Sequence, residues 1–77
     1  MRYALDMRAE KPAYLQIYEL LRQDIAAGVY AFGAKLPSKR SLAADFGVSL
    51  STVEHALELL SEEGYVGTRE RSGCFVI

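Results

Sequence analysis

The residues best suited to chemistry lie in the middle of the chain, between positions 35 and 55. Residues 35–52 hold three cations and one carboxylate: Lys35, Lys39, Arg40 and Asp45. Short polar side chains lie close by: Ser49, Ser51, Thr52 and His55. Cationic side chains bind phosphates, and small polar side chains suit a helix in the DNA major groove, which is roughly 12 Å wide. A nucleic acid is therefore one ligand to consider, and a solvated polar face on a helical packing unit is the other interpretation.

Catalysis and metal binding find less support. His55 has no Cys or His partner at metal-ligand spacing, and Cys74 lies in an apolar run, where a small core residue is expected. The carboxylates at i+4 spacing, Glu54, Glu58 and Glu62, are typical of a solvated helix face. The sequence has neither a Gly-rich phosphate loop nor a Lys suited to a Schiff base. We therefore expect no enzyme, no metal and no cofactor in this domain.

The composition describes one small domain. The chain has 77 residues, of which 51% are hydrophobic and 25% charged, as in folded proteins. No run approaches the roughly 20 apolar residues of a membrane helix, and the single Cys cannot form an internal disulfide. A cytoplasmic location without a membrane partner follows as an expectation. The net charge of −1 disfavours a nucleic-acid partner, but the cations are clustered and the acids lie elsewhere.

Hydrophobic periodicity predicts the elements that must position these residues. Apolar side chains recur at i, i+3, i+4, i+7 and i+11, which predicts a helix over residues 13–27 that Gly28 ends: Tyr14, Ile17, Tyr18, Leu21 and Ile25. Residues 1–12 are predicted to form an N-terminal arm, and residues 13–77 the domain. Tyr3, Leu5 and Met7 stand at alternate positions of this arm. Such a pattern fits an extra strand or an arm that pairs with a second chain.

Two further helices are predicted on either side of a tight turn. The first begins after Pro37 with Ser38 as its cap and ends at Gly47, with its buried side formed by Leu42, Ala43 and Phe46. The next begins at Ser49 or Ser51. The local capping-box pattern of residues 51–54 favours Ser51, whereas a tighter turn favours Ser49, which we prefer. This helix ends at Gly64 and buries Val53, Ala56, Leu57 and Leu60, so that Ser51, Glu54, His55 and Glu58 point away from the core.

A small β-hairpin is predicted to follow. Its strands are residues 65–66 and 74–77, and a polar loop over residues 67–73 joins them. Residues 29–36 contain a turn and at most a very short strand. The fold class is therefore mainly α with a small β-hairpin. Two helices joined by a short Gly turn and followed by a hairpin with Arg69, Arg71 and Gly73 predict a three-helix winged helix-turn-helix.

Several blocks of residues resemble the DNA-binding domain of the GntR family of bacterial transcription regulators. They are Tyr-Leu-Gln-Ile-Tyr at 14–18, Leu-Pro-Ser-Lys-Arg-Ser-Leu-Ala at 36–43, Gly-Val-Ser at 47–49, Ser-Thr-Val at 51–53, Glu-Gly-Tyr at 63–65 and Ser-Gly-Cys-Phe-Val at 72–76. The resemblance covers residues 11–77, with every block in the family's order. It implies a dimer on dyad operators and a C-terminal effector or dimerisation domain. The details are most similar to the MocR subgroup, whose second domain resembles a pyridoxal-phosphate aminotransferase, or to the short YtrA-like subgroup.

The resemblance also implies which residues meet DNA. Arg40 stands where the second helix of the family contacts DNA, Ser51 and Thr52 match the hydroxyl positions of the recognition helix, and Gly73 matches the wing tip. Leu50 and Glu54 stand where the family commonly has Arg. Because phosphates repel a carboxylate, while Glu can accept a hydrogen bond from the cytosine amino group, a different operator or weaker binding is expected.

The sequence thus predicts a sequence-specific DNA-binding domain, with a recognition helix over about residues 49–63 and a wing over about 65–77. The residues predicted to contact DNA are Lys35, Ser38, Lys39, Arg40, Ser49, Ser51, Thr52, Glu54, His55, Arg69, Arg71 and Gly73. The expected partners are double-stranded DNA and, in the full-length protein, a second copy of the chain. Pyridoxal phosphate is expected only in a C-terminal domain of the MocR type. The alternative is a winged-helix module that binds a protein through the acidic face of its third helix.

Overall fold

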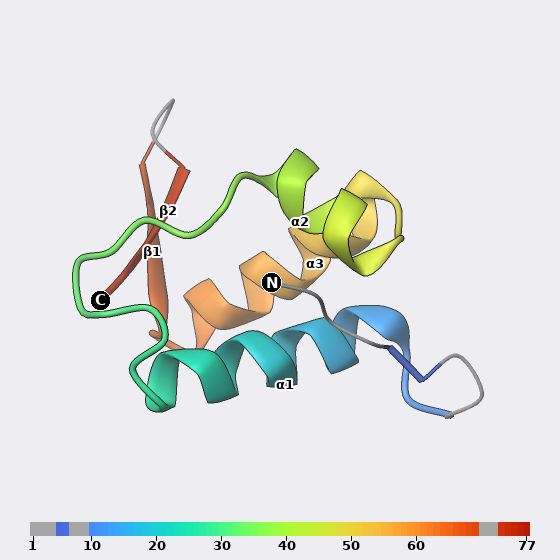
Figure 1. The fold of residues 1–77 in the computed structure, drawn as a ribbon, viewed down its shortest axis with the longest axis horizontal. Coiled ribbons are helices and arrows are strands. Elements are labelled where there is room, and N and C mark those ends of the chain that lie inside the picture. The colour runs from blue at the N-terminus through green and yellow to red at the C-terminus, as the bar shows by residue number, and fades with distance from the viewer. Residues whose placement is uncertain (1–4, 7–9, 70–72) are drawn as a thin grey trace.

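The computed structural model describes residues 5–6, 10–69 and 73–77, with Arg69 described by its backbone (Figure 1). Three helices come first, α1 (Ala13–Ala26), α2 (Lys39–Phe46) and α3 (Leu50–Glu62). The strands β1 (Val66–Arg69) and β2 (Gly73–Val76) follow and form an antiparallel hairpin. This order confirms the predicted fold class. The helix α1 crosses beneath α3, and the hairpin stands at the C-terminal end of α3 (Figure 1).

The helix α1 supplies one wall of the core. It buries Ile17, Tyr18 and Leu21, as its periodicity predicts, whereas Tyr14 and Ile25 near its two ends are only partly buried. It ends at Ala26, one residue before the predicted end, because the backbone N–H of Val29 donates to the carbonyl of Asp24 and that of Gly28 to the carbonyl of Ile25. These two bonds are those of a Schellman motif, which makes Ala27 the C-cap.

The turn between α2 and α3 is built by local hydrogen bonds. The Ser38 hydroxyl accepts a bond from the backbone N–H of Ser41 at 3.1 Å, which caps α2. Gly47 ends α2 with φ of 70°, a left-handed conformation that glycine adopts without a steric cost. The Ser49 hydroxyl accepts from the backbone N–H of Thr52 at 3.3 Å, so Ser49 caps α3 and the choice of Ser49 over Ser51 is confirmed. The turn is therefore only three residues long.

The hairpin strands are longer at the loop end than predicted. The register pairs Val66 with Val76 and Arg69 with Gly73, so residues 67–69 belong to β1 and not to the loop. Tyr65 and Ile77 lie outside the strands. Pairing along the whole segment satisfies backbone groups that an open loop would leave to water, which explains the difference. In the segment before α2, Lys35 forms an isolated antiparallel bridge with Phe75 of β2. The very short strand predicted within residues 29–36 is therefore a single bridge residue.

All elements meet in one core. The buried set comprises residues of each helix, of the segment before α2 and of both strands: Ile17, Tyr18, Leu21, Leu36, Leu42, Phe46, Val53, Ala56, Leu57, Leu60, Val66, Cys74 and Val76. The four predicted core residues of α3 are among them. The Tyr18 hydroxyl donates to Glu63 Oε1 at 3.1 Å, which joins α1 to the C-terminal end of α3. The position of α3 is thereby set by its buried residues in the core and by this hydrogen bond to α1.

Two described residues of the predicted arm, Leu5 and Asp6, contact the rest of the domain. Gln16 Oε1 accepts a bond from the backbone N–H of Asp6 at 2.8 Å, and Gln16 Nε2 donates to the carbonyls of Asp6 and Lys11 at 2.9 Å each. Leu5 packs partly against the core. Tyr3 and Met7, the other two positions of the alternating pattern, lie outside the described residues. Within residues 5–6, 10–69 and 73–77, none of the helices has the length and hydropathy of a membrane span.

Candidate nucleic-acid interface

The first turn of α3 carries a cluster of hydroxyl groups. Ser49 Oγ lies 2.8 Å from Thr52 Oγ1 and 3.1 Å from Ser51 Oγ. Ser49 and Ser51 are exposed, and Thr52 is half-buried. No acidic residue lies in this first turn. The backbone N–H groups of the helix N-terminus and three hydroxyl groups therefore meet at one exposed helix end, where they can bind phosphate or base edges.

Two cations occupy the first turn of α2. Lys39 and Arg40 are its first two residues, both are exposed, and this turn contains no acidic residue. The N-terminus of a helix carries partial positive charge, so a cation there is unfavourable by about 0.3–1 kcal/mol. In the part of the chain that the structure describes, the Arg40 side chain has no hydrogen-bond or ion-pair partner. An approaching anion would relieve this electrostatic cost.

Lys39 and Glu54 connect α2 to α3. Lys39 Nζ lies 3.3 Å from Glu54 Oε2. Both residues line a groove of about 530 Å³ that opens between α3, the hairpin and the start of α2. Two more α3 carboxylates, Glu58 and Glu62, line the same groove. The structure thus brings together a predicted phosphate contact and a predicted base contact, which sequence spacing alone did not indicate.

His55 is exposed on α3, as predicted, but one face of its ring is covered. The imidazole stacks on the phenol ring of Tyr14 with a centroid distance of 3.7 Å and an interplanar angle of 11°. Tyr14, predicted to lie in the core, is partly buried and packs against it. Periodicity places Tyr14 on the inner side of α1 and His55 on the outer side of α3, so the sequence does not indicate this contact.

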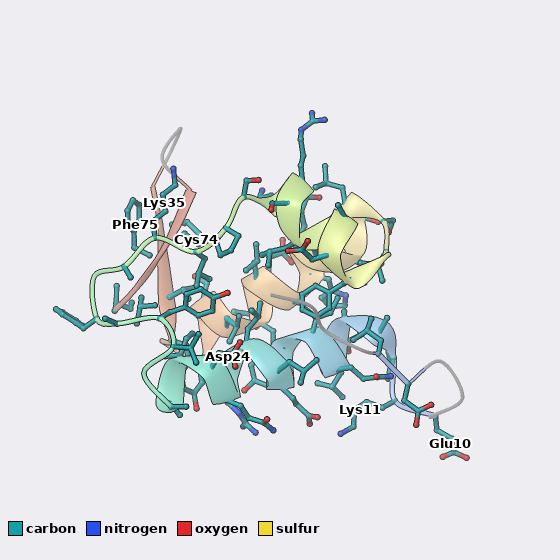
Figure 2. All side chains as sticks on the ribbon, in the orientation of Figure 1. Glu10, Lys11, Asp24, Lys35, Cys74 and Phe75 are labelled. Atoms are coloured by element: carbon teal, nitrogen blue, oxygen red, sulfur yellow. The ribbon has the colours of Figure 1, made fainter. Side chains whose placement is uncertain are left out.

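At the hairpin, Lys35 lies against the start of β2. A Cβ atom added to Gly73 would come within 3.3 Å of Lys35 Cε, and Gly73 has φ of +89°. Figure 2 shows Lys35 beside Phe75 and Cys74 at the hairpin. The structure therefore joins two predicted DNA contacts, Lys35 and Gly73. Arg71 and the side chain of Arg69 lie outside the described parts.

Cys74 is a core residue. Its side chain is buried, as expected. Burial raises the pKa of the Cys74 thiol above its ordinary value, and the charge of Lys39 opposes this shift only in part. A protonated thiol is a poor nucleophile. Across residues 5–6, 10–69 and 73–77, no group of three or more His, Cys, Asp and Glu side chains could hold a metal ion.

Comparison with known proteins places the chain in a family. Residues 13–76 match the family described as bacterial regulatory proteins, gntR family. The chain is 42% identical over 72 residues to the probable rhizopine catabolism regulatory protein MocR of Rhizobium meliloti, covering 94% of this chain and 15% of that protein. It is 41% identical over 64 residues to the Uxu operon regulator of Haemophilus influenzae, covering 83% of this chain and 24% of that protein. The chain thus spans a quarter or less of these relatives.

Solved structures show the same architecture. YtrA from Sulfolobus acidocaldarius, a GntR-family transcription factor, matches with a TM-score of 0.85 and 35% identity over 92% of this chain and 74% of that chain. The AraR DBD in complex with operator ORX1 matches with a TM-score of 0.92 and 28% identity over 99% of this chain and 96% of that chain. The family and its members are regulators of transcription and not enzymes, as predicted. The chain therefore belongs to the gntR family of bacterial regulatory proteins and is a winged helix-turn-helix DNA-binding domain of that family.

Proposed function

We propose that α3 of this domain lies in the major groove of an operator while the first turn of α2 and the hairpin contact the DNA backbone. The observation that carries this proposal is the exposed cation Arg40 in the first turn of α2, together with the hydroxyl cluster at the start of α3, in two helix first turns without acidic residues. The matched AraR DBD was solved with an operator bound. A similar docking of this chain presents both helix ends to phosphates.

The proposed contacts fall into two groups. The backbone contacts, which position the domain, are Lys35, Ser38, Arg40, Arg69, Arg71 and Gly73, whereas Lys39 lies beside the base contact Glu54. The contacts near bases, which set sequence preference, are Ser49, Ser51, Thr52, Glu54 and His55. Gly73 belongs to the first group because it lies against Lys35. Any larger residue at this position would be strained at its φ and would crowd Lys35. The stack on Tyr14 covers one face of His55 and leaves its orientation less free to change on binding.

A titration of the ¹⁵N-labelled chain with a short DNA duplex at low salt tests this face. We expect the largest amide shifts around residues 38–41, 49–52 and 73, and small shifts around residues 20–28 of α1. A negatively charged polymer without bases, such as dextran sulfate, is the control for electrostatic attraction alone. Largest shifts on α1 would contradict the proposed face. If DNA induced no amide shifts at all, the result would favour the alternative function, in which the domain binds a partner protein through the acidic groove along α3.

For the whole protein, we propose a homodimer that regulates transcription in the cytoplasm, where bacterial operators lie. Residues 1–12 would act as an arm and residues 13–77 as the DNA-binding domain. Pyridoxal phosphate, which the MocR resemblance implies, is assigned to a C-terminal domain and not to this one. Each described lysine, Lys11, Lys35 and Lys39, is exposed, whereas a Schiff-base lysine is activated by burial in an apolar pocket or by a neighbouring cation.

A further inference from the structure

We infer that Lys39 acts through Glu54, as a positioning residue for that carboxylate, rather than as an independent phosphate contact. The inference rests on the proposed function of α3 in the major groove. The carrying observation is the distance of 3.3 Å between Lys39 Nζ and Glu54 Oε2, which joins the first residue of α2 to the fifth of α3. The two side chains are 51% and 44% exposed, so neither is far from solvent or from DNA docked on this face.

The direction of the Lys39 side chain distinguishes it from its neighbour. Lys39 turns toward the groove beside α3, where it lines the wall together with Glu54, Glu58 and Thr68. Its charge also reaches Cys74 on β2, whose thiol pKa it lowers against the effect of burial. Arg40, one residue further along, has no such partner among the described residues. Adjacent residues on a helix point about 100° apart, so the two cations serve different surroundings.

The stabilisation of the Glu54 carboxylate by a neighbouring cation becomes more important once DNA is bound. In water, an exposed ion pair contributes little to stability. When DNA displaces the water, the phosphates repel the carboxylate, and the local attraction of Lys39 becomes stronger in the lower dielectric. A carboxylate held in place by Lys39 can then accept a hydrogen bond from a cytosine amino group. Without Lys39, the same carboxylate would be an unpaired charge at the interface.

A double-mutant cycle measures this dependence. We would determine the affinity of the 77-residue chain and of its K39M, E54Q and K39M/E54Q variants for one labelled duplex of arbitrary sequence by fluorescence anisotropy at low salt. We expect K39M to weaken binding about tenfold when Glu54 is present. In the E54Q chain, the same substitution is expected to weaken binding by about twofold or less, since the group it acts through is already gone. Circular dichroism of each variant confirms folding.

A second readout follows sequence preference. Selection from duplexes randomised over roughly two helical turns should show that K39M and E54Q lose the preference for the same base, while K39R keeps it. The exchanged pair K39E/E54R should prefer guanine there, because Arg pairs with the guanine edge. Equal losses of affinity from K39M with and without Glu54, and an unchanged preference, would overturn this inference alone. Absence of DNA binding by the unsubstituted chain would overturn the proposed function and the inference with it.

Discussion

Replacing Arg40 by Gln should change DNA binding and protein stability in opposite directions. Arg40 is the second residue of α2, at the positive end of the helix dipole, in a turn without acidic residues. Removing its charge is expected to raise the free energy of unfolding by about 0.3–1 kcal/mol. The same substitution removes one phosphate contact of the proposed interface. A loss of binding therefore cannot be attributed to unfolding.

The expected loss follows from the ionic character of that contact. A charged hydrogen bond contributes about 1.5–3 kcal/mol, so binding at fixed low salt should weaken roughly ten- to a hundredfold. Each neutralised phosphate adds about −0.9 to the slope of log K against log salt. The slope for Arg40→Gln should therefore be shallower by about 0.9. When salt rises from about 50 to about 200 mM, the affinity of the unsubstituted chain should therefore fall by a factor roughly three times larger than that of Arg40→Gln.

Fluorescence anisotropy with a duplex, measured over a salt series, gives the slope, and urea denaturation gives the stability. Arg22→Gln is a matched control because it removes the same group from α1. The Arg22 guanidinium carbon lies 5.4 Å from the centroid of the Tyr18 ring, whose hydroxyl contacts Glu63 at the far end of α3. We expect its slope to equal that of the unsubstituted chain. An unchanged slope for Arg40→Gln would refute the assignment of Arg40 to phosphate.

Three further predictions concern the fold. Ser49→Ala should lower the free energy of unfolding by about 1 kcal/mol, because the Ser49 hydroxyl caps α3, whereas Ser51→Ala should lower it far less. Equal decreases for the two variants in urea denaturation would contradict the assignment of Ser49 as the cap. Leu60→Ala, at a fully buried position, should cost about 2–5 kcal/mol in thermal denaturation, whereas Leu50→Ala, at a position 39% exposed, should cost under about 1 kcal/mol. Cys74 has its thiol pKa raised by burial, so the unfolded chain ionises first and stability should fall as pH rises through the ordinary thiol range. The native thiol should react slowly with iodoacetamide, and a Cys74→Ala variant should show a weaker decline with pH.

Much of the fold could be predicted because its signals are local. The apolar spacing of α1 and α3 indicated which residues would be buried, and Ile17, Leu21 and Leu60 are fully buried. The ends of α2 were also predictable, since Ser38 and Gly47 satisfy the helix termini within a few residues. The prediction was less accurate for the hairpin. Of residues 67–69, which are Gly, Thr and Arg, only Thr68 is a residue type that favours strands, so this strand forms because β2 lies opposite it.

The sequence by itself determined the helices, their caps and the exposed polar side of α3, because hydrogen bonds and periodicity act over three or four residues. The tertiary structure decided the contacts between these elements. It paired Lys39 with Glu54, stacked His55 on Tyr14 and laid Lys35 against Gly73. The residues of each pair are 15 to 41 positions apart in the chain. Their distance depends on how the helices cross and where the hairpin stands, which packing of the whole core sets and no local pattern encodes.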